Sequence, residues 1–83
     1  MSDFQEIAAP FPGIFYLKAE PNAAPYVQPG DSVSAGDVVA LVEVMKMFHE
    51  VRSEIDGRLV EFLVEDGDAV SMGQTIARLE TGL

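Results

Sequence analysis

The chain contains an internal repeat, and this repeat constrains the fold more than any other feature of the sequence. Residues 27–43 match residues 64–80 at a constant offset of 37, and eight of the 17 aligned positions are identical. The identical pairs are Val27/Val64, Gly30/Gly67, Asp31/Asp68, Val33/Val70, Ser34/Ser71, Gly36/Gly73, Ala40/Ala77 and Glu43/Glu80. We therefore expect two related structural units, neither of which buries its apolar side chains without the other.

A second, weaker match precedes each copy of the repeat, because residues 7–15 match residues 51–59 at an offset of 44. The two offsets differ by seven, so the first half carries about seven residues that the second half lacks. These extra residues lie within residues 17–25, where Pro21 and Pro25 disfavour a continued strand. The sequence therefore predicts a surface loop at about residues 17–25.

Each copy of the repeat has two glycines that bracket a short extended piece, namely Gly30 with Gly36 and Gly67 with Gly73. Glycine adopts positive φ at little cost, so these four positions are expected to lie in turns. The flanking runs, such as residues 38–42, are rich in β-branched side chains, which are typical of strands. About four short strands in each half predict an all-β sandwich or flattened barrel with a pseudo-twofold axis between the halves.

Length and composition narrow the possible functions. The chain has 83 residues, and we expect residues 1–83 to form one domain. Acidic residues outnumber basic ones by 14 to 5, and the net charge of −9 disfavours nucleic acid as a partner. The chain has no cysteine, which excludes disulfides and thiol nucleophiles. His49 is the single histidine and cannot form a metal site alone, so we interpret it as a solvent-facing strand residue.

The sequence offers no signal for a membrane or for export. A signal peptide begins with cationic residues that are followed by a long apolar run. Residues 1–4 are acidic and do not fit this pattern. The longest apolar stretch, residues 38–42, is far too short to span a bilayer. We therefore expect a cytoplasmic protein that does not bind membranes.

Lys46 interrupts an otherwise apolar run, residues 44–48, at the junction between the two halves. Burial of an unpaired ammonium would cost several kcal/mol, so the lysine must reach water. A helix over residues 38–51 would do so by placing Glu43, Lys46 and Glu50 on one face. A hairpin with Lys46 at its tip would do so as well.

The hairpin is favoured over the helix, because the valines on either side of Glu43 form strands more readily than helices. Met45 and Lys46 would occupy the turn, although two-residue turns prefer pairs such as Asn-Gly. This mismatch suggests that these residues are present for a reason other than turn stability.

Residues 43–47, Glu-Val-Met-Lys-Met, lie between two Gly-Asp-x-Val repeats and resemble the biotinyl-lysine motif of biotinyl domains. The resemblance covers about residues 7–80. It implies a flattened barrel of two four-stranded antiparallel sheets, with the modified lysine at a hairpin tip and the termini together at the opposite end. It also implies that a biotin–protein ligase attaches biotin to Lys46, with Met45 and Met47 as the flanking recognition residues.

Residues 12–16, Pro-Gly-Ile-Phe-Tyr, together with the insertion that follows, are similar to the biotin carboxyl carriers of acetyl-CoA carboxylase. Those carriers have a protruding loop, the thumb, at this position. The resemblance implies that biotin on Lys46 shuttles a carboxyl group from biotin carboxylase to a carboxyltransferase, in acetyl-CoA carboxylase or a related acyl-CoA carboxylase. The chain shows no nucleophile–base pair and no metal set, so we expect no catalytic residue and no metal ligand.

Two alternatives are consistent with the same fold. A lipoyl-type carrier domain shares the architecture, but its lysine is typically preceded by Asp and followed by Ala, whereas this chain has Met45 and Met47. A structural or interaction module with an unmodified Lys46 is the other alternative. The mass of the intact protein from cells supplied with biotin separates the three interpretations.

Overall fold

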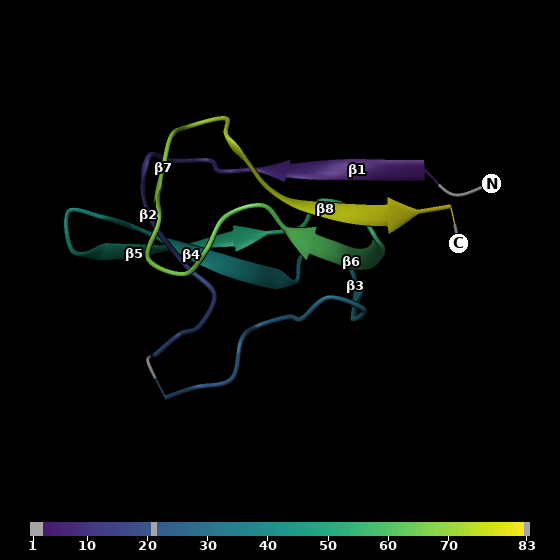
Figure 1. Ribbon diagram of the computed structural model, residues 1–83, viewed down its shortest axis with the longest axis horizontal. Coiled ribbons are helices and arrows are strands. Elements are labelled where there is room, and N and C mark those ends of the chain that lie inside the picture. Colours follow the sequence, from purple (N-terminus) through teal and green to yellow (C-terminus); the bar gives the residue numbers. More distant parts are fainter. Residues whose placement is uncertain (1–2, 21, 83) are drawn as a thin grey trace.

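The computed structural model describes residues 3–20 and 22–82, which form two four-stranded antiparallel sheets (Figure 1). The eight strands are β1 (Asp3–Ala8), β2 (Gly13–Tyr16), β3 (Ser32–Val33), β4 (Val38–Val44), β5 (Met47–Arg52), β6 (Gly57–Phe62), β7 (Ala69–Val70) and β8 (Thr75–Thr81). One sheet has the order β1-β8-β6-β3 and contains the strands at both ends of the chain, so we call it the terminal sheet. The other has the order β5-β4-β2-β7, and we call it the hairpin sheet. The predicted all-β class with two four-stranded sheets is confirmed.

The two halves of the chain are related by a pseudo-twofold axis that exchanges the two sheets. Strands β1 and β2 correspond to β5 and β6 at the offset of 44, whereas β3 and β4 correspond to β7 and β8 at the offset of 37. The strand register agrees, because Ile14 lies opposite Glu43 in the hairpin sheet and Arg58 lies opposite Glu80 at the matching place in the terminal sheet. The predicted relation between the halves is therefore confirmed.

The core lies between the two sheets and draws on both halves of the chain. Phe15 and its counterpart Leu59 are almost completely buried, and the ring centroids of Phe15 and Phe62 are 5.8 Å apart. Because side chains alternate across a strand, only one face of each strand contributes to this core. Each sheet therefore also has an outer face. The side chains on the outer face of one sheet can differ from those on the outer face of the other.

Two of the turn glycines form backbone hydrogen bonds between the two halves of the chain. Gly30 has a φ of 97° and donates its backbone N–H to the carbonyl of Leu59 at 2.8 Å. Gly67 has a φ of 92° and donates to the carbonyl of Phe15 at 2.7 Å. The predicted turns are confirmed, and positive φ explains why glycine occupies both positions.

The hairpin between β4 and β5 lies at the end of the molecule opposite the two ends of the chain (Figure 1). Asp3 pairs with Thr81, which places the first and last strands side by side. The pseudo-twofold axis explains this arrangement, since the β4–β5 turn takes the place in one half that the chain ends take in the other. In the part of the chain that the structure describes, no helix could cross a membrane.

Candidate functional site

The turn between β4 and β5 consists of Met45 and Lys46, with Val44 and Met47 as the last paired residues before it. Met45 has a φ of 50° and Lys46 a φ of 68°. Positive φ at both central residues is the mark of a type I′ turn, whose twist matches that of the strands it joins. The predicted hairpin is confirmed, and the helical alternative over residues 38–51 is wrong.

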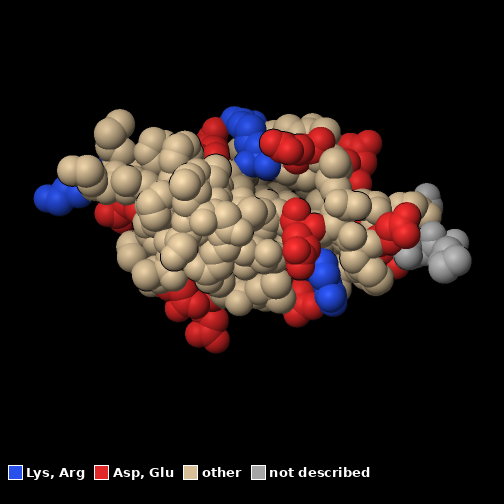
Figure 2. Space-filling view, turned by 90° about the horizontal axis from the view of Figure 1, so that it is seen from above, with Lys and Arg blue, Asp and Glu red and all other residues tan. Residues whose placement is uncertain are grey.

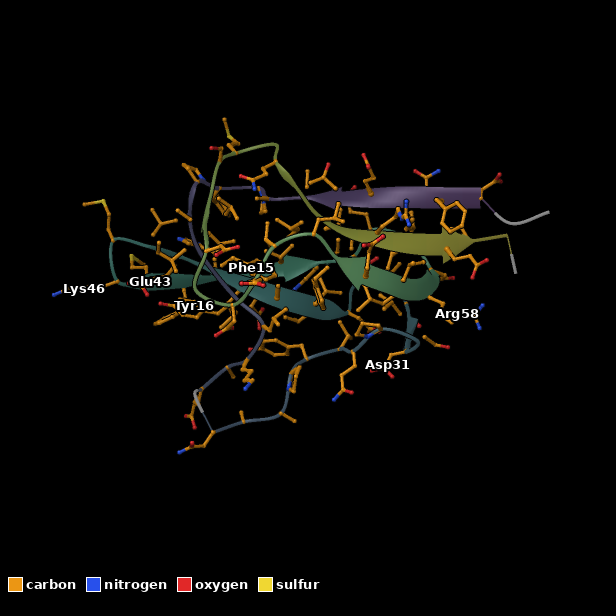
Figure 3. All side chains as sticks on the ribbon, in the orientation of Figure 1. Phe15, Tyr16, Asp31, Glu43, Lys46 and Arg58 are labelled. Atoms are coloured by element: carbon orange, nitrogen blue, oxygen red, sulfur yellow. The ribbon has the colours of Figure 1, made fainter. Side chains whose placement is uncertain are left out.

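The turn presents Lys46 to solvent at the far tip of the molecule (Figure 3). Met45 and Met47 on either side are 91% and 65% exposed. Within residues 3–20 and 22–82, the ion pairs are all formed by arginines, so no carboxylate holds the Lys46 ammonium. The amine is therefore accessible to another protein from most directions.

The backbone of this turn is strained for the residues it contains. A left-handed conformation costs a residue other than glycine about 1–3 kcal/mol, and Asn-Gly would lower that cost. Met45 and Lys46 therefore destabilise the hairpin relative to the residues that such turns prefer. Strain that persists at an exposed position is typical of a functional site.

A polar and aromatic cluster lies at the base of the hairpin, on the outer face of the hairpin sheet. The hydroxyl of Tyr16 donates to Oε1 of Glu43 at 3.3 Å (Figure 3). The ring centroids of Tyr16 and Phe48 are 6.1 Å apart. Desolvation and the nearby Glu43 carboxylate raise the pKa of the Tyr16 hydroxyl, so the phenol remains a donor. Sequence reasoning missed this cluster, although the strand alternation and the identity of Glu43 with Glu80 hinted at it.

The loop predicted at residues 17–25 projects away from both sheets (Figure 1), and we call it the thumb. Its base is closed by a bridge between Lys18 and Pro25 and by a 3.0 Å hydrogen bond from the Tyr26 N–H to the Leu17 carbonyl. The Leu17 N–H also donates to Oδ1 of Asp66 at 2.7 Å, which connects the thumb to the second half. The predicted loop is confirmed, whereas Pro21 lies outside the described residues.

A hollow of about 340 Å³ lies between the thumb and the hairpin sheet. Its lining comes from the thumb, from strands β2 and β5 and from the loop before β7, namely Tyr16, Lys18, Ala19, Glu20, Phe48 and Asp66. The lining of this hollow is thus drawn from segments that are distant in the sequence.

His49 lies on a strand, as expected, but the expectation that it faces solvent is only partly right. The side chain is half-buried, and its ring centroid is 4.6 Å from that of Phe11. Among the described residues there is no group of three or more His, Cys, Asp or Glu side chains that could hold a metal ion. The surface is acidic in character, and Figure 2 shows acidic side chains around the border of an uncharged area.

Comparison with known proteins shows what this geometry resembles. Residues 5–79 match the protein family described as "Biotin-requiring enzyme". A biotin carboxyl carrier protein of acetyl-CoA carboxylase from Pyropia yezoensis is 38% identical over 80 residues, which cover 96% of this chain and 51% of that protein. The protein of the same name from Chlamydia trachomatis serovar D is 40% identical over 73 residues, covering 88% of this chain and 44% of that protein.

The chain thus spans about half the length of the curated relatives it matches. Among solved structures, the urea carboxylase of Kluyveromyces lactis is similar with a TM-score of 0.77 and 27% identity, over 93% of this chain and 6% of that protein. The family match covers most of the sequence, and it includes both halves of the repeat and the hairpin between them. The chain therefore belongs to the biotin/lipoyl family of biotin-requiring enzymes.

Proposed function

We propose that this chain is a biotin carboxyl carrier domain, comprising residues 1–83, and that Lys46 is its attachment site. The observation that carries the proposal is the position of Lys46, which is exposed on a strained two-residue turn opposite the chain ends. A primary amine at such a tip can be acylated without any rearrangement of the fold. Biotin, when bound in amide linkage, supplies a ureido nitrogen that accepts and releases a carboxyl group.

The residues around Lys46 suit covalent attachment by a biotin–protein ligase. Met45 and Met47 present flexible, polarisable side chains on both sides of the amine, and we assign them to ligase recognition. The β4–β5 hairpin holds the lysine away from the body of the domain, so the ligase can reach the amine without contacting the core. The same features allow an attached group to enter the active site of a second enzyme.

The partners that we assign are biotin carboxylase, which loads the carboxyl group, and a carboxyltransferase, which removes it. The relatives named as carriers of acetyl-CoA carboxylase support acetyl-CoA as the final acceptor. This chain contributes tethering rather than catalysis, since a tethered reactant has a high effective concentration within the reach of its arm. We place this work in the cytoplasm, without nucleic acid or membrane as a partner.

The proposal is tested by supplying the biotinylated chain, ATP and labelled bicarbonate to purified biotin carboxylase. We expect label to become attached to the protein, and we expect none on Lys46→Arg, because arginine keeps the charge but offers no acylation site. A lipoyl-type carrier would instead be modified by a lipoate ligase and would take up no label. An unmodified module would show neither reaction.

A further inference from the structure

The pseudo-twofold axis allows the outer faces of the two sheets to be compared position by position. The outer face of the terminal sheet, here the terminal face, presents Phe4, Glu6, Arg58, Glu61, Arg78 and Glu80. The outer face of the hairpin sheet, here the hairpin face, presents at the matching places Phe48, Glu50, Ile14, Tyr16, Leu41 and Glu43. The strand pairing matches on both faces except at a bulge between Leu59 and Glu61, which the pairing of β2 with β4 lacks. The differences at Arg58, Arg78 and Phe4 are therefore not imposed by the fold.

The two arginines of the terminal face form ion pairs with carboxylates of the same face. Arg58 pairs with Glu80 at 2.8 Å, and Arg78 pairs with Glu61 at 2.7 Å. The guanidinium of Arg78 also lies 5.2 Å from the centroid of the Phe4 ring. Both arginines of this face thus have a carboxylate partner, and its one aromatic ring, although 54% exposed, has a guanidinium beside it.

The hairpin face lacks both arginines, since Ile14 stands where Arg58 stands and Leu41 where Arg78 stands. Leu41 is only 6% exposed, yet it lies outside the central core cluster, so it is buried on this outer face. Phe48 remains 59% exposed beside Tyr16. The hairpin face therefore has an apolar centre that the matching face of the same domain does not have.

Glu43 shows the same contrast in charge. Its counterpart Glu80 is neutralised by Arg58. Within residues 3–20 and 22–82, no basic nitrogen lies within 4.0 Å of the Glu43 carboxylate, which accepts a hydrogen bond from Tyr16. A carboxylate without a cation, at the edge of an exposed apolar patch, is suited to a basic side chain on another protein.

We propose that the hairpin face is the docking surface for the enzyme that carboxylates biotin, an inference that rests on the proposed function. The occupant is a protein surface with an apolar centre opposite Phe48 and Tyr16 and a basic side chain opposite Glu43. Both co-substrates of that enzyme, ATP and bicarbonate, are anions, so the mouth of its active site is expected to be positively charged. The face begins at Phe48, two residues from Lys46, close enough for docking to direct the lysine into that site.

The substitution Ile14→Arg tests the proposal, because it copies onto the hairpin face a residue that the terminal face already accommodates. The new arginine can pair with Glu43 as Arg58 pairs with Glu80, so the melting temperature is expected to stay the same. We expect the KM for the biotinylated carrier in ADP formation by biotin carboxylase to rise about tenfold, with the rate recovered at saturating carrier. The matched control is Arg58→Ile on the terminal face, for which we expect an unchanged KM.

A second matched pair uses residues of one type and similar exposure, since Phe48 is 59% and Phe4 54% exposed. Phe48→Ala is expected to raise the same KM several-fold, whereas Phe4→Ala is not. All variants are first shown by mass to carry one biotin, which separates docking from attachment. An unchanged KM for Ile14→Arg, an equal rise for Arg58→Ile, or an effect confined to biotin attachment would overturn this inference. Failure of the biotinylated wild-type chain to support ADP formation would instead overturn the proposed function itself.

Discussion

Met45 and Lys46 both adopt a backbone conformation that glycine or asparagine adopts at lower cost, with φ values of 50° and 68°. Their side chains make no compensating contact with the core, since they are exposed at the tip of the hairpin. No contact in the folded structure therefore compensates for the stability lost at these two positions. It is explained if the residues are retained for recognition and attachment.

This explanation predicts a stability gain when the turn is given its preferred residues. The double variant Met45→Asn, Lys46→Gly should raise the free energy of unfolding by about 1–2 kcal/mol, because both new residues tolerate positive φ. Urea denaturation of the unmodified proteins measures the change, with the single variant Met45→Asn as an intermediate that retains Lys46. A double variant less stable than the parent would show that the turn is not strained.

A second prediction concerns the turn glycines that connect the halves. Gly30→Val and Gly67→Val should each lower the free energy of unfolding by about 1–3 kcal/mol, since no nearby atom blocks a side chain but φ exceeds 90° at both. The two losses should be similar because the turns are equivalent. Gly30→Asn is the control and should lose less, as asparagine tolerates positive φ. Unchanged melting temperatures for both valine variants would contradict the assignment.

Residue-level details differ in how far the sequence predicts them. The position of Lys46 follows from local information, namely β-branched neighbours and a charge within an apolar run. The contact of Tyr16 with Glu43 does not follow from local information. It depends on the register between β2 and β4, which the intervening loops set. The contact between the tilted rings of His49 and Phe11 does not follow from the sequence either, because it depends on where the loop between β1 and β2 lies against β5.

At the level of elements, the thumb is the segment that breaks the symmetry of the two halves. Its existence follows from the difference between the offsets of 37 and 44. The sequence does not predict the hydrogen bond of the thumb to Asp66 or its position over a hollow beside Phe48. Both depend on how the strands pack together in three dimensions. The second half completes the same strands without a thumb, so the loop is not needed for folding.

A third prediction follows for the thumb, to which we assign a functional role. Lys18 and Pro25 already face each other, so replacing residues 18–24 with a short glycine-containing turn should leave the melting temperature nearly unchanged. Carboxyl transfer should be impaired, or a lipoate ligase should become able to modify Lys46. The control Ala24→Ser keeps the loop length and should behave as the parent. Normal biotinylation and normal turnover of the shortened protein would reduce the thumb to a surface loop.

At the level of the whole molecule, the repeat predicts two equivalent halves of about four short strands each, and the structure confirms this. Each strand of the first half has its counterpart at one of the two offsets. The repeat does not predict the order of strands within the sheets, because equivalence between halves does not state which strands pair. The exchange of the two sheets by the axis is therefore a finding of the structure.

The same symmetry separates what the fold requires from what function adds. The turns and the core are shared by both halves, whereas the Met45-Lys46 tip, the thumb and the apolar hairpin face occur once. The tip and the apolar face belong to the hairpin sheet, and the thumb follows strand β2 of the same sheet and lies over a hollow beside Phe48. This concentration is expected if a single exposed lysine has to be recognised by several enzymes.

Peptide mapping after co-expression with a biotin–protein ligase tests the central claim most directly, because it identifies the modified side chain. The chain has two lysines, and Lys18 lies at the base of the thumb without flanking methionines. We expect the intact mass to show one added biotin, the peptide map to place it on Lys46, and Lys46→Arg to show no adduct. Biotin found on Lys18, or an unmodified protein under these conditions, would contradict the account.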